Sequence, residues 1–404
     1  MKIFGFEFGR KKDKVDIITL PMGNTYNHEK FYSVSRQGVG VSRNGSGLNY
    51  DYNIPAVTEL LNSNYIYFGE DNQYPNILNN LYYSSPFHAS IVDFKRLNLI
   101  GGGYEVTPMF GATEADLIMI KQMEYMFDEN TINKLTMDLL IHNRICIRVT
   151  WNTEHTKIIK LERVEPANVR STKKVDGKVK KYAYNIDWTA ALNARQNDYI
   201  YIPAFDSFDK SEKEQLYVWQ GFSPGLEYYT QPTYANAANW MALDGQISYY
   251  HKSNMENSIN PSVVLKFPEK LANKEEEQQF IQNLRRSFTG AKNAGKVLTF
   301  FSNGRDLLPE IDVLPGNELG DDFAVTNETI IKNIAFSHTI NPIIMGIAVP
   351  GNLGAGAELE IAYRIFQNTF VKPNQKTLND VINFFYKTNG VKATFTLNET
   401  NILI

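Results

Sequence analysis

Hydrophobic side chains recur every three or four residues in several stretches of the chain, and this spacing predicts its helices. The stretches are 75–82, 86–100, 114–142, 233–257, 274–289, 321–340 and 358–385. Pro86 stands at a favoured first-turn position, and the glycines at 101–103 end the helix that it begins. The stretch 114–142 is long enough for one or two helices, and Pro373 is expected to kink or break the last helix.

Other stretches alternate apolar and polar residues, or form short apolar runs, and these predict strands. They are 145–151, 157–164, 178–186, 199–203, 262–267, 297–301 and 307–314. Asp176-Gly177 favours a hairpin turn, and residues 208–215 are expected to form a charged loop. Helices and strands together predict an α+β fold, with residues 70–205 as one α+β unit and residues 1–55 as a flexible, polar N-terminal arm.

The charge balance of the chain changes which partners are expected. With 404 residues, a net charge of −3 and a pI of about 6.1, it lacks the basic excess of a protein that grips duplex DNA. Any contact with nucleic acid should therefore be loose or local. The one cysteine, Cys146, lies in an apolar run and is read as a small core residue, and no apolar run is long enough to span a membrane.

The residues that usually carry catalysis or metal binding are scattered. The six histidines, at positions 28, 88, 142, 155, 251 and 338, show no metal-ligand spacing, and His251 and His338 are read as structural. The glycines of 351–356 resemble a phosphate cradle, but the Lys of such a motif is missing, and Glu358 and Glu360 follow, which would repel phosphate. No enzyme activity, cofactor or metal is expected.

Three motifs in residues 219–386 give the chain a likeness to a known family. In the first motif, a long helix runs into Tyr249–Met255 and ends at Asn260-Pro261 before an apolar strand. In the second, Gly290–Lys296 precedes another strand. In the third, the helix of 322–340 ends at Asn341-Pro342. In this order the motifs resemble those of the portal proteins of tailed bacteriophages. The family's usual Gly near the end of the first helix is Asn257 or Ser258 here.

The resemblance implies a portal-like α+β architecture with an α/β wing, a two-helix stem, a βαβ clip, a tunnel loop and a long C-terminal helix. Its plan divides the chain into an N-terminal arm (1–55), the wing (56–220), a descending stem helix (221–260), the clip (261–318), an ascending stem helix (319–342), the tunnel loop (343–357) and a C-terminal helix with a reduced crown (358–404).

The same plan implies three groups of site residues. The DNA-facing tunnel loop would contain Val349, Asn352, Leu353, Gly354, Ala355 and Gly356. The clip would dock the packaging motor or an adaptor through Arg285, Arg286, Lys292, Asn293 and Lys296, although an ordinary solvated helix face would look the same. Acidic residues at Asp321, Asp322 and Glu328 would repel DNA from the channel wall, or would simply be solvated helix-start charges.

The function implied is that of a ring subunit, expected as a dodecamer, through which double-stranded DNA is packaged and ejected at one capsid vertex. The implied partners are further copies of the chain, the terminase large subunit, a head–tail adaptor, the major capsid protein or scaffold, and DNA held without sequence preference. The chain would be assembled in the host bacterial cytoplasm and reside in the virion. Two alternatives stay open: another head–tail connector or adaptor ring, and an enzyme with a substrate site at the Gly-rich loop.

Overall fold

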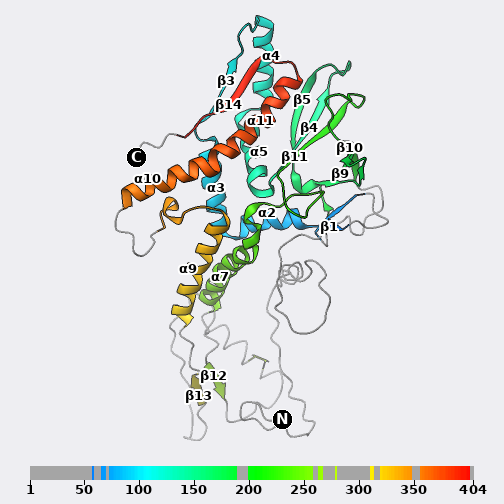
Figure 1. Ribbon diagram of the computed structural model, residues 1–404. Coiled ribbons are helices and arrows are strands. Elements are labelled where there is room, and N and C mark those ends of the chain that lie inside the picture. Colours follow the sequence, from blue (N-terminus) through cyan, green and yellow to red (C-terminus); the bar gives the residue numbers. More distant parts are fainter. Residues whose placement is uncertain are drawn as a thin grey trace.

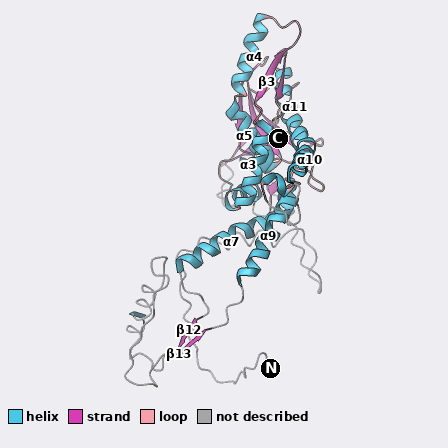
Figure 2. Ribbon diagram, turned by 90° about the vertical axis from the view of Figure 1, so that its left-hand side faces the viewer, coloured by secondary structure: helices cyan, strands magenta, loops and turns pink. Residues whose placement is uncertain are grey.

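The molecule has a body of helices and short antiparallel sheets, from which two helices extend as a pair (Figures 1 and 2). The pair consists of α7 (Ala238–Asn257) and α9 (Leu319–Ser337). Strands β12 (Val263–Lys266) and β13 (Glu310–Val313) lie beyond its far ends and pair antiparallel. The computed structural model describes residues 57–58, 65–69, 72–188, 199–257, 263–266, 278–279, 310–313, 319–347 and 355–400.

A three-stranded antiparallel sheet lies at the centre of the body. Strand β4 (Arg144–Trp151) lies between β11 (Glu214–Gln220) and β5 (Ile158–Val164). Successive side chains of a strand point to opposite faces, and both faces of β4 are covered. One face joins the first core through Ile145, Ile147, Val149 and Trp151. The other face places Cys146 in a smaller core, which confirms the prediction that this cysteine is a core residue.

A second three-stranded sheet covers that other face. It consists of β6 (Val169–Ser171), β9 (Lys181–Tyr184) and β10 (Ile200–Pro203), in the order β10-β9-β6. The predicted hairpin is confirmed between β7 (Lys174–Val175) and β8 (Lys178–Val179). Its turn residues Asp176 and Gly177 both have positive φ, which suits the right-handed twist of a two-residue hairpin.

Helices α4 (Glu114–Met126) and α5 (Glu129–His142) cover the first face of the central sheet. The stretch 114–142 therefore contains two helices, because each has its own N-terminal cap. Thr113 accepts from the backbone amide of Asp116, and Asp128 accepts from that of Thr131.

The C-terminal part of the chain completes the first core. Strand β14 (Ala393–Leu397) pairs antiparallel with β3 (Tyr104–Pro108), and α11 (Lys372–Thr388) packs behind it. Helix α10 (Ala355–Phe366) leads into α11 through a π-helical turn at Gln367–Val371. Figure 1 shows α10 and α11 following one another along one side of the body.

The expected break at Pro373 does not occur. Proline lacks an amide hydrogen, and its ring clashes with the carbonyl four residues earlier in an α-helix. The π-helical turn just before Pro373 changes this pattern, and the Lys372 amide there donates to the carbonyl of Gln367. The proline then stands in the first turn of α11, where it is tolerated.

A second core holds the extended pair to the body. It is formed by α2 (Tyr74–Ser84), α3 (Pro86–Ile100), the 3-10 turn η3 (Thr233–Ala237) and the upper ends of α7 and α9. Strand β2 (Tyr67–Phe68), paired with β1 (Val57–Thr58), adds Phe68 to it. Two short 3-10 turns complete the described body, η2 (Pro166–Asn168) and η6 (Pro342–Met345).

The sequence-based prediction missed the short strands β1, β2 and β6 and the longer strands β3, β11 and β14. The expected charged loop 208–215 is wrong at its end, because β11 begins at Glu214 and pairs with β4 along its whole length. The predicted strands at 262–267 and 307–314 are confirmed by β12 and β13. The strand predicted at 297–301 and most of the helix predicted at 274–289 lie outside the described residues, as does the arm of residues 1–55.

The packing of α11 makes a direct prediction about stability. Phe385 is fully buried and contacts the rings of Phe127, Phe205 and Tyr217. Phe385→Ala should lower the free energy of unfolding by about 3–5 kcal/mol, because it leaves a cavity in the first core. Phe208→Ala is the matched control, since Phe208 is 97% exposed and its loss should change stability by less than about 0.5 kcal/mol. Urea denaturation measures both; equal effects would show that α11 is not part of the core.

Candidate functional site

Burial along α7 and α9 changes from the body outward. In α7, Met241 is fully buried, whereas the described side chains beyond it are partly or fully exposed. In α9 the buried positions are Ile330, Ile334 and Ala335, near its body end. The two helices pack against each other, and α7 also packs against α2 and α3. The body therefore holds one end of the pair, and the other end projects from it (Figure 2).

Both helices carry apolar side chains that the described part of the chain leaves exposed. Leu243 is 40% and Tyr249 61% exposed on α7, and Phe336 is 73% exposed on α9. A helix that only packs against its own domain usually has one apolar face and one polar face. The expectation that α7 has apolar residues on more than one face is confirmed, and the alternative of a fully buried core helix is wrong for its described part.

A carboxylate of α7 caps a helix of the body. Asp244 Oδ2 accepts from Ser85 Oγ at 2.6 Å and from the backbone amide of Phe87 at 3.1 Å. Ser85 is the N-terminal cap of α3 and accepts from the His88 amide at 3.2 Å. The first amides of a helix lack partners within it and carry partial positive charge, so a carboxylate there is stabilising. Asp244 thus fixes α7 against the start of α3.

Next to this cap, α7 approaches the body at backbone distance. A Cβ placed on Gly245 would lie 2.7 Å from the carbonyl oxygen of Ser84, at the end of α2. No side chain fits at that distance unless one of the two helices moves. Asp244 and Gly245 together therefore define where α7 crosses the turn between α2 and α3.

Three basic side chains meet at the body end of α9. His338 follows α9, and its Nε2 lies 2.8 Å from Nδ1 of His88 on α3. Lys95 Nζ lies 3.2 Å from His338 Nδ1 and donates to the His338 carbonyl at 2.8 Å. All three are buried. Burial lowers the pKa of Lys95 to about 7, and burial and Lys95 together lower the pKa of His88 to about 3 and that of His338 well below 6.5.

Aromatic rings enclose these three groups. Tyr234 of η3 stacks on His338, with ring centres 5.0 Å apart, and lies tilted against His88 at 4.5 Å. The Lys95 ammonium lies 4.1 Å from the centre of the Phe370 ring. The prediction that His338 is a structural histidine is confirmed. The approach of His88 to His338 was not predicted, because 250 residues separate them in the sequence.

Most of the sequence-predicted site residues lie outside the described residues. This applies to the whole clip set, Arg285, Arg286, Lys292, Asn293 and Lys296, and to four tunnel-loop positions, Val349, Asn352, Leu353 and Gly354. Ala355 and Gly356 form the start of α10, which begins before Glu358, where the sequence had placed its start. The end predicted for the tunnel loop, residue 357, is therefore wrong, because residues 355–357 belong to α10.

Of the three acidic residues predicted to face the channel, the structure describes the side chain of Glu328 only. Asp321 and Asp322 belong to the first turn of α9, and their side chains are not described. Glu328 is exposed and forms an ion pair of 2.7 Å with Lys332, one turn further on. Its charge is thus balanced on its own helix. The channel-wall role of the three acidic residues stays a prediction.

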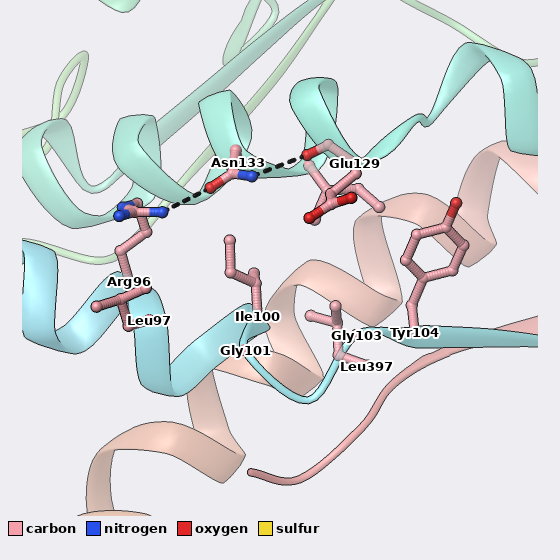
Figure 3. A pocket seen from close by; sticks show the side chains of 10 residues that line it. Arg96, Leu97, Ile100, Gly101, Gly103, Tyr104, Glu129, Asn133 and Leu397 are labelled. Carbon is pink, nitrogen blue, oxygen red and sulfur yellow. Dashed lines mark hydrogen bonds between the residues drawn. The ribbon is translucent and has the colours of Figure 1, made fainter.

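The body contains a pocket, whereas most of the Gly-rich loop 351–356, where the enzyme alternative places its substrate site, lies outside the described residues. The pocket has a volume of about 420 Å³ and lies between the end of α3 and the start of α5 (Figure 3). Arg96 donates to Asn133 Oδ1 at 2.9 Å, and Asn133 donates to the Glu129 carbonyl at 3.2 Å. Its polar groups therefore bind each other, and its lining has neither a histidine nor a Ser or Cys nucleophile. This arrangement gives no support to an enzyme.

Metal binding and membrane insertion were also tested within the described ranges. No cluster of three or more His, Cys, Asp or Glu side chains there has the geometry to hold a metal ion. None of the helices described is both long and apolar enough to cross a bilayer.

The close contact at Gly245 predicts an unusual sign for a helix substitution. Gly→Ala inside a helix normally stabilises by up to about 1 kcal/mol. Gly245→Ala should instead destabilise by about 1–3 kcal/mol, because the new methyl group collides with the Ser84 carbonyl. Ser248→Ala, one turn further along at an exposed position, is the control and should change stability by less than about 0.5 kcal/mol. A thermal midpoint that rises in Gly245→Ala would contradict the close approach.

Comparison with known proteins gives the chain its relatives. Its fold matches a chain from the neck of an empty gene transfer agent particle (TM-score 0.52, 14% identity, 78% of this chain and 82% of that one). It also matches a chain from the virion of a native gene transfer agent particle (0.51, 14%, 80% and 83%). A lower match is the HK97 family phage portal protein from Corynebacterium diphtheriae (0.44, 10%, 79% and 95%). At these identities, the two matches with a TM-score above 0.5 show a shared fold.

A comparison with curated proteins gave no match. The family model described as phage portal protein, however, matches residues 99–401, which is most of the chain. The match includes the central sheet, the projecting helix pair and the C-terminal helix with its strand. The chain therefore belongs to the phage portal protein family.

Proposed function

We propose that this chain is the subunit of a portal ring, which forms the channel for double-stranded DNA at one capsid vertex. Family membership supports this function, as does the fold that the chain shares with proteins of gene transfer agent particles. The observation that carries the proposal is the projecting helix pair with apolar residues on its uncovered face.

The exposed apolar side chains on α7 and α9 need a cover. Removing apolar surface from water contributes about 25 cal/mol per Å², so side chains such as Leu243, Tyr249 and Phe336 favour a partner. In a ring, each copy presents one face to the copy before it and a different face to the copy after it. A helix pair with two apolar faces meets this requirement, since one face holds the body and the other meets a neighbour.

The family plan then assigns a role to each part. The α7–α9 pair is the stem, the body of residues 56–220 with the C-terminal helix is the wing and reduced crown, and β12 and β13 belong to the clip at 261–318. The residues at 343–354 form the tunnel loop. We expect weak contact with DNA, because the net charge is −3 and the acidic residue Glu328 already has Lys332 as a partner.

The partners follow from these roles. The clip would bind the terminase large subunit during packaging and a head–tail adaptor afterwards, through Arg285, Arg286, Lys292, Asn293 and Lys296. The wing would contact the major capsid protein or scaffold. The ring would assemble in the host bacterial cytoplasm, remain in the virion and act without catalysis of its own.

Ring closure can be tested on the stem. The purified wild type should form closed rings with a central opening in negative-stain images. Leu243→Glu combined with Phe336→Glu should abolish closed rings, because charges would replace apolar contacts between copies. The variant should keep its circular dichroism spectrum, since both side chains are exposed within one subunit. Phe208→Glu, a change at a more exposed position on the body outside the stem, is the control. Unchanged rings in the double variant would refute the stem contact.

Motor docking can be tested on the clip. Arg285→Glu with Arg286→Glu should weaken binding of the terminase large subunit by about tenfold or more, because opposite charges then become like charges. Binding is measured with the assembled ring. In the double variant, the affinity should also depend less on the salt concentration than it does in the wild type. Lys376→Glu on α11 is the control, since this lysine is exposed on the body. Equal affinity in the double variant and the wild type would remove these arginines from the docking surface.

A further inference from the structure

The contact between α3 and the end of α9 depends on a defined arrangement of hydrogens. While Lys95 is charged, its ammonium group can only donate, so His338 Nδ1 then accepts. The hydrogen of His338 then lies on Nε2, which donates to His88 Nδ1. The hydrogen of His88 in turn lies on Nε2, a buried atom that finds no hydrogen-bond partner in the described part of the chain. In this state each of the two imidazoles is neutral.

One added proton breaks this arrangement. If His88 is protonated, its Nδ1–H points at the Nε2–H of His338, so that two donors meet at 2.8 Å. If His338 is protonated, its Nδ1–H points at the Lys95 amino group. In either case a second positive charge lies beside Lys95 in a site lined by aromatic rings. The cluster therefore stays closed only while both imidazoles are neutral.

We propose that His88, His338 and Lys95 form a proton-responsive latch, which holds the end of α9 on α3 near neutral pH and releases it in acid. The latch lies between the body and the projecting pair, so its release would loosen α9 at the point where α9 joins the body. This inference concerns one subunit and stands whether or not the chain forms rings.

The groups that face the latch do not stabilise a protonated imidazole. Lys95 faces it from α3, Tyr234 from η3, Tyr82 from α2 and Phe370 from the π-helical turn. Among the described residues, the electrostatic influences on His338 come from Lys95 and His88, and both lower its pKa. From α7, the Asp244 carboxylate binds the Ser85 hydroxyl and not an imidazole. The structure therefore shows no carboxylate paired with either protonated ring within these ranges.

The direction of the pH response follows from the pKa values. Both imidazoles have a pKa below the 6.5 of an exposed histidine, so the open state binds protons that the closed state does not. The contribution of the imidazoles to the closed state is thus fully present above pH 6.5 and is lost as the pH falls below it. Between pH 7.5 and 5.5 the opening equilibrium should rise about tenfold for one released imidazole and about 100-fold for two. The lowered pKa of Lys95 acts in the same direction at higher pH.

Hydrogen–deuterium exchange of the full chain tests the latch. Protection factors, corrected for the intrinsic pH dependence of exchange, are compared at pH 7.5 and 5.5 for peptides of residues 330–340. In the wild type they should fall by about 10- to 100-fold on acidification, whereas those of α11 should stay constant. The body also contains two buried titrating groups on α5, Asp138 and His142, and burial raises the pKa of Asp138 to about 7. Because both lie on α5, their effect on exchange should appear in peptides other than 330–340.

Two variants decide whether the imidazoles are responsible. His88→Asn with His338→Gln keeps polar groups at both positions but removes titration, so the change in residues 330–340 should disappear. His155→Gln is the control, because this histidine lies in a turn of the body, and it should respond like the wild type. An unchanged wild-type peptide, or an equal fall in the double variant, would overturn the proposal. If the double variant does not fold, His88→Asn alone is compared in the same way. One titrating imidazole, His338, then remains, so the change should be smaller than in the wild type; a change equal to that of the wild type would overturn the proposal.

Discussion

The structure depends on how two helices are held at one end only. Met241 of α7 and Ile334 of α9 are fully buried in the second core, and Asp244 of α7 caps α3 across the same junction. Apolar burial supplies the stabilisation there, and the cap and the contact at Gly245 fix the position of α7. The rest of the pair projects from the body, which is possible because few of its side chains are needed in the core of the subunit.

The body that holds this pair is assembled from distant parts of the chain. Strand β14 pairs with β3, and α11 completes the core between α4, α5 and the central sheet. The platform under the pair, α2 and part of α3, precedes the family match at residue 99 and yet supplies the contacts to Asp244 and His338. The body thus joins segments from both halves of the chain and gives the projecting pair its base. This arrangement suits a ring in which neighbouring copies cover the remaining apolar faces.

The sequence predicted the local elements well where a clear signal was present. Helical spacing located α2, α3, α7, α9 and α11, and Asp176-Gly177 located the hairpin, because these signals act over a few residues. The strands β3 and β14 were missed although both alternate apolar and polar residues, because each is only five residues long and its pairing partner lies far away in the sequence. A kink or a break was expected at Pro373. The helix is not broken there, because a π-helical turn, which has no simple sequence signal, accommodates the proline.

The site residues also show that local sequence patterns do not predict contacts between distant parts of the chain. Spacing along the chain could describe His88 and His338 as scattered, but only the packing of α3 against the end of α9 brings them together. The exposed second face of α7 was visible in advance, since apolar residues around more than one side of a helix are a local feature. Which of those residues would be buried by the body depended on the position of α2 and α3, which the pattern does not reveal.

The central claim is that copies of this chain cover each other's projecting helices in a closed ring. Native mass spectrometry of the purified wild-type protein tests it most directly, since a closed ring has one fixed number of 46.1 kDa subunits. The account predicts a single oligomeric mass that stays the same as the protein concentration is raised. A mass of one subunit at every concentration, or an open series of sizes, would contradict it.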